Sequence, residues 1–319
     1  MIDCREIPVR VIALSDEKFA TAKSNLNRVC NFADIKRWNG IRGKDLFEED
    51  NLILRSDHRD IIEQKYPHVS LPVHWLSTQA QLALQTNKTN VFDMHNPGAV
   101  GCALSHISLW QHMVATGMPI MFVCEDDIEF KDFFLTKKRS FTQELNSILS
   151  TFHTDFDVLN LNALFIPNPI QFATKTVQSK HKDVVFVHGF AGRCQGYLIT
   201  QHGARFLLQN AFPLLHIVDA YMTIFSKMRQ YSKEYVYLAT KNSWLEHELV
   251  NLTTSAIGYD LGQCATDAIF LIPPTFLLSL IGFFVISMIA MFILVVVNYR
   301  LKNRLLLVKQ NNLAKRIKK

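Results

Sequence analysis

The sequence predicts an α/β domain in which helices flank a central and mostly parallel sheet, followed by one C-terminal transmembrane helix. Short apolar runs alternate with longer stretches of helical periodicity along most of the chain, and this alternation is typical of α/β folds. A chain of 319 residues is long enough for one large or two small domains with a sizeable core. We therefore expect a folded domain over residues 1–267, a membrane anchor over 268–299 and a basic tail over 300–319.

The N-terminal part is expected to contain two strands and a helix. Residues 8–14 form a short apolar run that predicts the first strand. A polar turn at residues 15–17 separates this strand from a helical pattern over residues 19–30, and residues 33–38 are the second expected strand. Residues 46–94 have mixed periodicity and several polar stretches, so we interpret them as irregular helices and loops without an assigned role.

The middle of the chain predicts a helix directly before a buried strand. Apolar residues within 106–114 recur at a spacing that suits one helix face, and residues 120–124 are continuously apolar. The remaining expected elements are strands at residues 157–161 and 184–188 and helices at residues 203–209 and 219–228.

One segment near the C-terminus is long and apolar enough to span a membrane. Residues 268–299 contain no charged side chain, and residues 275–297 are a run of 23 mostly apolar residues. At about 1.5 Å per residue, such a helix covers the bilayer's hydrocarbon core of about 30 Å. The alternative is a buried helix of a soluble domain, which is rarely so long. Pro273 and Pro274 precede the run, where they can open a helix.

Two signals on the orientation of this segment disagree. Basic residues after Tyr299 place the tail in the cytosol by the positive-inside rule, which leaves the body outside. Residues 1–14, however, lack the continuous apolar centre of a signal peptide. The body should then fold in the cytosol, with the last segment inserted after synthesis as a tail anchor. We favour this second interpretation.

The distribution of charge argues against nucleic acid as a partner. Eight basic residues lie in the tail after position 299, and the body up to Asp267 has a formal net charge of −2. A near-neutral body offers no broad basic surface for a phosphate backbone. The six cysteines are scattered and form no CxxC pair, a pattern that predicts neither a zinc site nor a small disulfide scaffold.

An acidic cluster follows the apolar strand at residues 120–124. Side chains two positions apart on an extended segment face the same side, so Glu125 and Asp127 can converge. Ligands of open α/β sheets gather at the carboxyl ends of strands, and carboxylate oxygens suit Mg²⁺ or Mn²⁺. Such an ion could bridge to the diphosphate of a nucleotide-sugar and neutralise the leaving group. The alternative is a solvated acidic turn.

Several motifs occur in a characteristic order along the chain. Residues 98–110 read GAVGCALSHISLW and residues 123–128 read VCEDDI. Shorter motifs lie at residues 9–14, 38–40, 155–159, 196–200, 203–204 and 218–219. In this order they resemble glycosyltransferase family 25, which includes lipopolysaccharide and collagen galactosyltransferases. The resemblance covers most of residues 8–225.

This resemblance implies a GT-A fold, a nucleotide-sugar donor such as UDP-galactose or UDP-glucose, and a divalent cation. It makes Glu125 and Asp127 the expected ligands of Mn²⁺ or Mg²⁺, whereas Asp126 would bond ribose or sugar hydroxyls. The other residues expected to bind the nucleotide-sugar are Asn39, Ser105, His106 and Gly196. The sequence departs from the family at residues 15–17, where an acidic turn replaces the usual basic, arginine-containing one. This departure bears on donor affinity and on catalytic competence.

Three positions have a structural interpretation beside the functional one. Asp219 follows two apolar residues and precedes a helix, so it is either the general base for an acceptor hydroxyl or a helix N-cap. His106 either contacts a phosphate or makes a structural hydrogen bond at the start of a helix. Gly196, like Gly101, either permits close backbone approach or serves a tight turn.

The layout of the whole chain adds a second hypothesis. A glycosyltransferase-like body without a signal peptide, followed by a C-terminal anchor, resembles the tail-anchored, heparan-sulfate-binding envelope proteins of poxviruses. That resemblance implies a virion membrane, with an ER- or Golgi-type membrane as the alternative, and attachment to host cells through sulfated glycans or glycosaminoglycans. A patch that would bind sulfates, or simply a solvated helix face, is formed by Lys131, Lys137, Lys138 and Arg139.

Overall fold

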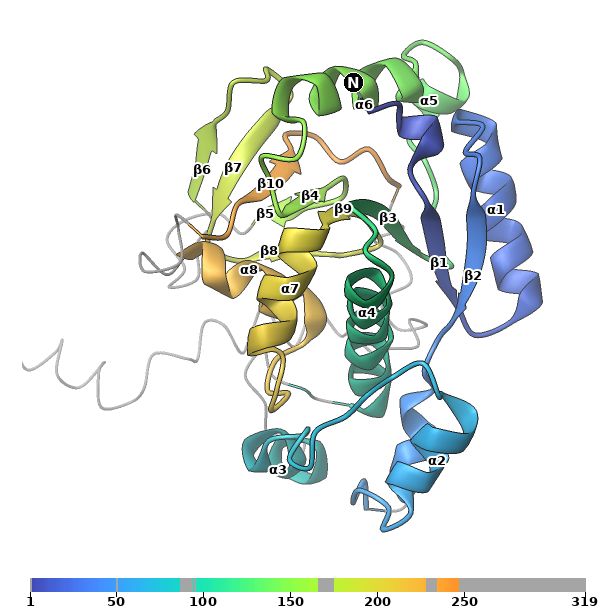
Figure 1. Ribbon diagram of the computed structural model, residues 1–319, viewed down its shortest axis with the longest axis vertical. Helices are drawn as coiled ribbons and strands as arrows, with labels where there is room; N and C mark the ends of the chain where they lie inside the picture. The colour runs from blue at the N-terminus through green and yellow to red at the C-terminus, as the bar shows by residue number, and fades with distance from the viewer. Residues whose placement is uncertain are drawn as a thin grey trace, which may run out of the picture. The chain divides into compact units, whose positions relative to one another are not determined.

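An eight-stranded sheet forms the centre of the described part of the chain (Figure 1). Six of its strands run in one direction, whereas β7 and β9 run in the other. This arrangement confirms the predicted α/β class with a mostly parallel central sheet. The strands lie in the order β2 (Ile35–Asn39), β1 (Val9–Ala13), β3 (Ile120–Glu125), β9 (Gly196–Thr200), β4 (Val158–Asn160), β10 (Tyr237–Thr240), β7 (Val184–His188) and β6 (Lys175–Gln178).

The structure describes residues 2–49, 51–86, 94, 96–165, 175–227 and 234–246. All of them belong to the first of two compact units of the chain, Met1–Asp260. Within these ranges, no helix combines the length and the apolar character needed to cross a bilayer. The predicted anchor at residues 275–297 and the basic tail lie outside the described residues.

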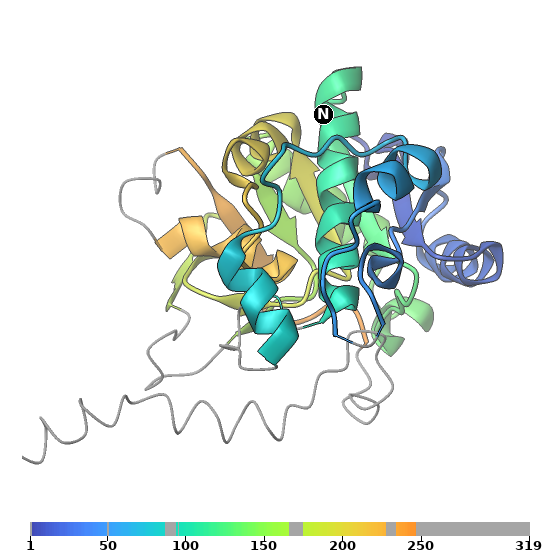
Figure 2. The ribbon, with the colours of Figure 1, turned by 90° about the horizontal axis from the view of Figure 1, so that it is seen from below.

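Helices cover both faces of the sheet and enclose a separate core on each. One core includes residues of α4, α7 and α8, and the other includes residues of α1 and α6. Figure 2 shows the long helix α4 lengthwise, between α2 and α3. The helices are α1 (Asp16–Val29), α2 (His58–Lys65), α3 (Thr78–Thr86), α4 (Pro97–Thr116), α5 (Asp132–Leu135), α6 (Phe141–Phe152), α7 (Gln201–Asn210) and α8 (Val218–Lys227). Two 3-10 turns, η1 (Cys4–Glu6) and η2 (Gly43–Leu46), and a small sheet of β5 (Leu164–Phe165) and β8 (Ala191–Gly192) complete the described part.

The strand β3 sends alternate side chains into the two cores. Phe122 and Cys124 belong to the core beneath α1 and α6, whereas Met121 and Val123 belong to the core beneath α4. Because successive side chains of a strand point to opposite faces, Glu125 at the end of β3 lies on the α4 side. This alternation is the local reason why the acidic motif meets α4.

The helices α1 and α4 have ordinary capping residues. Ser15 caps α1 by accepting a hydrogen bond from the Lys18 backbone N–H. The predicted polar turn at residues 15–17 is therefore the N-terminus of the helix. Asn96 caps α4 in the same way, and α4 ends at Gly117, whose φ of +71° suits glycine.

The structure contains more strands and a longer central helix than the sequence predicts. The helix expected at residues 106–114 is the second half of α4, which has 20 residues. The strands β6, β9 and β10 were not expected, and neither were α5 and α6. The strands expected at residues 8–14, 33–38, 120–124, 157–161 and 184–188 are present as β1, β2, β3, β4 and β7.

Candidate functional site

The acidic motif lies at an edge of the sheet where several strand ends meet. The strand β3 ends at Glu125, and β9 runs antiparallel to it, with its first residue Gly196 paired with Cys124. The loop before β9 therefore lies at the carboxyl end of β3, where the Glu125 backbone N–H donates to the Gln195 carbonyl at 2.9 Å. The strand β4 pairs with the other side of β9. Its carboxyl end thus belongs to the same edge.

Asp126 and Asp127 contact different segments at this edge of the sheet. Asp126 accepts a hydrogen bond from the Leu14 backbone N–H at 3.4 Å and lies 3.5 Å from Lys18 Nζ. Asp127 accepts a hydrogen bond from Gln195 Nε2 at 3.0 Å. The motif therefore connects the turn between β1 and α1 with the loop before β9.

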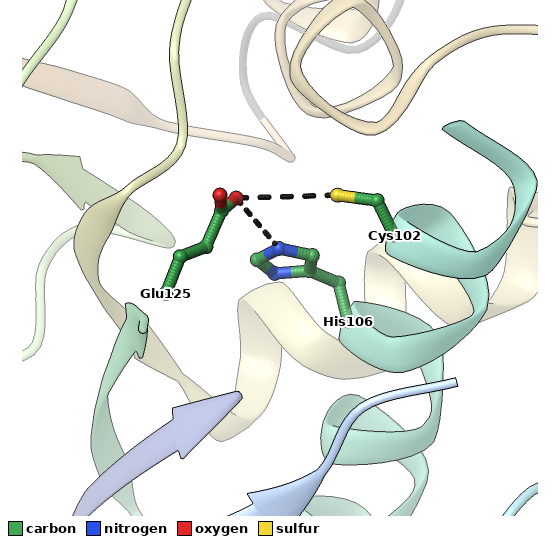
Figure 3. Close-up of side chains that lie close together, drawn as sticks. All are labelled: Cys102, His106 and Glu125. Carbon is green, nitrogen blue, oxygen red and sulfur yellow. Dashed lines mark hydrogen bonds and ion pairs between the residues drawn. The ribbon is translucent and has the colours of Figure 1, made fainter. Parts of the chain in front are cut away.

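Glu125 points toward α4 and pairs with His106 (Figure 3). The distance from His106 Nε2 to Glu125 Oε1 is 3.2 Å, and the imidazole is fully buried. Burial alone would lower the pKa of His106, but hydrogen bonds and charge interactions with Cys102 and Glu125 outweigh it and raise that pKa to about 9. Burial would likewise raise the pKa of Glu125, and its bond to His106 lowers it instead. The buried imidazole and the partly exposed carboxylate are thus hydrogen-bonded, and each favours the charged form of the other.

The other ring nitrogen of His106 belongs to an aromatic network. Nδ1 lies 2.8 Å from the Tyr197 hydroxyl, which also accepts a hydrogen bond from Trp110 Nε1 at 3.0 Å. His106 therefore makes a structural hydrogen bond, as one of its two interpretations from the sequence proposed, but it lies in the middle of α4 and not at the start of a helix. Its contact with Glu125 also ties it directly to the acidic motif.

The surroundings of Asp127 disfavour the charged form of its carboxyl group. Asp127 is exposed, yet desolvation by its surroundings and the charge of Glu125 raise its pKa to about 6. Glu125 and Asp127 are thus close enough for their charges to repel. A cation between them would relieve this repulsion.

Asp219 lies at the start of α8 and reaches the same loop. Its Oδ2 accepts a hydrogen bond from the Arg193 backbone N–H at 3.0 Å, and its Oδ1 accepts one from Ala220 N–H at 3.0 Å. Burial raises the pKa of Asp219, and the charge of Glu125 raises it further. Asp219 is the second residue of α8 and not its N-cap, and its raised pKa is that of a candidate base.

The other expected nucleotide-sugar residues occupy three different settings. Asn39 is exposed at the end of β2, paired with Ala13 at the end of β1. Ser105 is buried, and its hydroxyl accepts from the Ile41 backbone N–H at 2.8 Å. Gly196 is buried within β9, where an added Cβ would lie 2.8 Å from Leu245 Cδ1. Asn39 lies at the same edge as Glu125, whereas Ser105 and Gly196 have evident packing roles.

The expected basic patch is partly neutralised. Lys131 Nζ lies 2.7 Å from Glu246, and Arg139 pairs with Glu144 at 2.9 Å. Arg139 also lies 3.7 Å from Asp183. Two of the four candidate cations therefore have acidic partners, and two, Lys137 and Lys138, are exposed.

One functional candidate, Arg193, has no counterpart in the sequence interpretation. It lies in the loop before β9, in a left-handed conformation with φ of +73°. Its side chain is half-buried, and burial lowers its pKa. Among the described residues, no hydrogen bond or ion pair reaches its guanidinium. No local sequence signal marks this arginine, because only the pairing of β9 with β3 brings it to the acidic motif.

Cys102 and Cys194 were likewise not expected at the site. The Cys194 Sγ lies 3.1 Å from Glu125 Oε1, and the Cys102 Sγ lies 4.0 Å from the same oxygen. Cys102 precedes His106 by one helical turn, so the sequence does place these two on one face of α4. Cys194 comes from a loop distant in the chain, and its approach was not predictable.

The sequence of this chain matches a known protein family. The sequence profile of glycosyltransferase family 25 (LPS biosynthesis protein) matches residues 51–222, just over half of the chain. The matched range contains the acidic motif, the loop before β9 and Asp219.

Several curated proteins share shorter regions with this chain. A glycosyltransferase 25 family member of Aedes aegypti is 31% identical over 135 residues, which are 40% of this chain and 19% of that protein. Procollagen galactosyltransferase 1 of Danio rerio is 29% identical over 129 residues, 40% of this chain and 20% of that protein. The inactive glycosyltransferase 25 family member 3 of Mus musculus is 54% identical over 37 residues, 12% of this chain and 6% of that protein. The match thus spans about a fifth, or less, of these relatives' length.

Proposed function

Because the chain belongs to glycosyltransferase family 25, we propose that it transfers a hexose from a UDP-sugar to an acceptor hydroxyl on a GT-A fold. The names of its relatives include a procollagen galactosyltransferase and an inactive family member, so activity itself is part of the proposal. The observation that carries it is the contact of Asp219 with the loop Arg193–Gln195, whose other end holds Asp127. This loop links a candidate base to the acidic motif.

Asp219 is the proposed general base. The pKa of Asp219 is raised, so its carboxylate binds a proton more readily than that of an ordinary aspartate. A general base that accepts the proton of an acceptor hydroxyl near neutral pH needs this property. Two backbone N–H donors fix the carboxylate. In the proposed step, the acceptor oxygen bonds the sugar's anomeric carbon, its proton passes to Asp219, and UDP leaves with the electrons of the broken bond.

Asp127 and Glu125 are the proposed holders of the divalent cation, Mn²⁺ or Mg²⁺. The residues fit such an ion, because desolvation and, after it, the charge of Glu125 raise the pKa of Asp127 to about 6, and a cation stabilises two carboxylates that otherwise repel each other. When bound, the ion would neutralise charge on the diphosphate leaving group. Glu125 is additionally oriented by His106.

Arg193 is the proposed contact of the diphosphate. A half-buried guanidinium that finds no acidic partner in the described part of the chain is costly, and a phosphate group would supply hydrogen bonds in a bidentate manner. This arginine would take over the task of the basic turn that the family carries after its first strand and that residues 15–17 lack.

We further propose that residues 275–297 anchor the chain in a membrane. The glycan-attachment alternative is less well supported by the surface, because Lys131 and Arg139 of its basic patch are paired with Glu246 and Glu144. The transferase is therefore the function that we put forward.

The experiment is a measurement of thermal stability followed by a transfer assay on the full-length chain. UDP-glucose and UDP-galactose, each with Mn²⁺, should raise the unfolding midpoint, because a ligand that binds only the folded state stabilises it. At ligand concentrations about 100-fold above Kd, we expect a rise of about 5 °C. Free UDP should accumulate when an acceptor is present.

Two variants separate binding from chemistry. Asp127→Ala should lose the Mn²⁺-dependent rise, whereas Asp219→Asn should keep it and lose release of UDP. Asp60→Asn, which changes an exposed acid in the first turn of α2, is the matched control and should behave as the wild type. The absence of any rise with either donor in the wild type would remove the transferase proposal.

A further inference from the structure

A cluster of four potential metal ligands joins Glu125 of the acidic motif to α4 and to the loop before β9. Cys102, His106 and Glu125 offer ligand atoms that all lie within 4.8 Å of one another (Figure 3). Cys194 is the fourth member, with its Sγ 3.1 Å from Glu125 Oε1 and 3.9 Å from His106 Nε2. We infer that these four side chains form a binding site for a thiolate-preferring divalent ion, for which zinc is the natural occupant.

The chemistry of the donors distinguishes this site from the proposed Mn²⁺ or Mg²⁺ site. Two thiols, an imidazole and a carboxylate are the ligand types of zinc, whereas Mg²⁺ and Mn²⁺ prefer oxygen. The exposed carboxylate Asp127, with its partner Gln195, takes no part in the cluster. Glu125 is common to both proposals, whereas Cys102, His106 and Cys194 belong only to the zinc site and Asp127 only to the Mn²⁺ or Mg²⁺ site, so variants of these residues test the two proposals separately.

Four of the six distances between the donor atoms are close to those of a tetrahedron around one ion. Zinc bond lengths of about 2.3 Å to sulfur and about 2.0–2.1 Å to nitrogen and oxygen give edges of about 3.6 Å between sulfur and the lighter atoms, and about 3.4 Å between nitrogen and oxygen. The observed edge between His106 Nε2 and Glu125 Oε1 is 3.2 Å. The edges that involve Cys194 are 3.1 and 3.9 Å, and that between Cys102 Sγ and Glu125 Oε1 is 4.0 Å. All four lie within about 0.5 Å of the ideal values.

The fold holds these ligands on ordered elements. Cys102 and His106 are one turn apart on α4 and share one face of the helix. Glu125 closes β3, and Cys194 lies two residues before β9, which pairs with β3. Three of the four positions thus belong to a helix and a strand of the central layers, and the fourth is tied to them by the pairing of the sheet.

The surroundings include the support that zinc-bound histidines usually have. His106 Nδ1 lies 2.8 Å from the Tyr197 hydroxyl, which would fix the ring when Nε2 binds the metal. His106 is fully buried, while the Glu125 side chain retains 20% exposure and Cys102 is half-buried. An ion can therefore reach the cluster from the surface and is then largely shielded from water.

The test is metal binding by the full-length chain, purified in detergent and fully reduced. After incubation with zinc and removal of free metal, elemental analysis should find one zinc per chain. Cobalt, used as a spectroscopic probe in place of zinc, should give the visible absorption of a tetrahedral site and a thiolate charge-transfer band in the near ultraviolet. Wild-type protein that retains no zinc, or cobalt spectra without a thiolate band, would overturn the inference.

Variants test the ligand set against a general metal affinity. Cys102→Ser and Cys194→Ser should each abolish the thiolate band or weaken it strongly, and Tyr197→Phe should lower zinc affinity about 10–100-fold through the loss of support for His106. Cys124→Ser, which changes the thiol next to Glu125 that faces the opposite core, is the matched control and should bind zinc normally. Equal binding by all of these folded variants would contradict the inference.

Two further outcomes separate competing interpretations. Asp127→Ala should keep zinc while it loses the response to UDP-sugar and Mn²⁺, so that failure of one proposal leaves the other standing. Mass spectrometry of the protein as isolated, without reductant, reports whether Cys102 and Cys194 are linked. A disulfide that persists in the presence of zinc and physiological reductant would show a redox pair instead of a metal site.

Discussion

Asp127 combines two properties at the residue scale that conflict with each other. Its carboxylate is needed in the charged form to bind a cation, yet its surroundings favour the protonated form and raise its pKa to about 6 from an ordinary 3.8. A group whose pKa is higher in the folded state contributes stability at low pH, and this contribution is lost as the pH rises through the folded pKa. The charged Asp127 should therefore destabilise the metal-free protein at neutral pH.

We predict that Asp127→Asn stabilises the metal-free protein. The shift would correspond to about 3 kcal/mol for a fully buried group, and solvent screening at the exposed Asp127 reduces our expectation to about 1 kcal/mol or less. The gain should be present at pH 7.5 and should shrink between about pH 6 and pH 4, where the wild-type carboxyl takes up its proton. Urea denaturation with a chelator present, at both ends of this range, measures it. A gain that is equal at both pH values would contradict the electrostatic cause.

Arg193 provides a second prediction at this scale. Arg193→Gln should leave the unliganded protein as stable as the wild type or up to about 1 kcal/mol more stable, because the variant removes a half-buried charge to which none of the described residues is paired. The stabilisation by UDP-sugar should fall, because the diphosphate loses a charge-assisted contact. Thermal unfolding with and without UDP-glucose and Mn²⁺ measures both effects. Arg205→Gln, an exposed arginine of α7, is the control, and an equal loss in that variant would exclude a specific role for Arg193.

At the scale of elements, the position of α4 depends on glycine. A Cβ on Gly101 would lie 2.3 Å from the Ile41 carbonyl oxygen, and a Cβ on Gly43 would lie 1.7 Å from the Pro97 carbonyl oxygen. The backbones of α4 and η2 are therefore in direct contact, with no room for a side chain. The close backbone approach that the sequence suggested for Gly101 is confirmed, and its purpose is the packing of a helix against a turn.

We predict that Gly101→Ala destabilises the protein although alanine is the better helix former. Helix propensity alone would favour the variant by about 1 kcal/mol, whereas forcing two backbones apart costs about 1–3 kcal/mol and would also shift Cys102 and His106. The net effect should be lower stability and weaker zinc binding. Ala115→Gly, at an exposed position of the same helix, measures the propensity difference alone. If Gly101→Ala proved more stable than the wild type, the contact would not be as tight as described.

Helices and strands could be predicted where the residues of the element itself carry a recognisable pattern. The strands β1, β3 and β7 are short apolar runs and were recognisable as such. The N-terminal half of α4 was not, because Gly98 and Gly101 resemble a turn when the contact with η2 is unknown. The strand β6 is exposed along its whole length and carries no apolar signal. Its place follows from pairing with β7, which no local pattern reveals.

The candidate site could be predicted only in part, because it is a property of the whole sheet. The acidic motif, Asp219 and His106 have local signals and were identified. The antiparallel insertion of β9 between β3 and β4 brings Arg193 and Cys194 to that motif from about 70 residues away in the chain. Pairings between distant segments of this kind are not encoded in any short stretch of sequence.

At the scale of the whole molecule, the chain combines a near-neutral body with an apolar segment and a basic tail. The body carries a formal net charge of −2, and all basic excess lies after position 299. Attachment to a membrane should then come from burial of residues 275–297 in the hydrocarbon core, with the tail contributing only an electrostatic attraction that salt weakens. Integration and surface binding respond differently to high salt and high pH, so the two contributions can be separated.

We predict that the full-length chain, expressed in cells, stays in the membrane fraction after extraction with alkaline carbonate and with high salt. Deletion of residues 268–319 should release the protein completely, because both contributions are lost. Deletion of residues 300–319 alone should leave it resistant to carbonate, since the apolar segment remains. Immunoblots of the pellet and supernatant measure the distribution. If the chain that lacks residues 268–319 remained in the carbonate-washed pellet, the body itself would bind the membrane and the anchor assignment would be wrong.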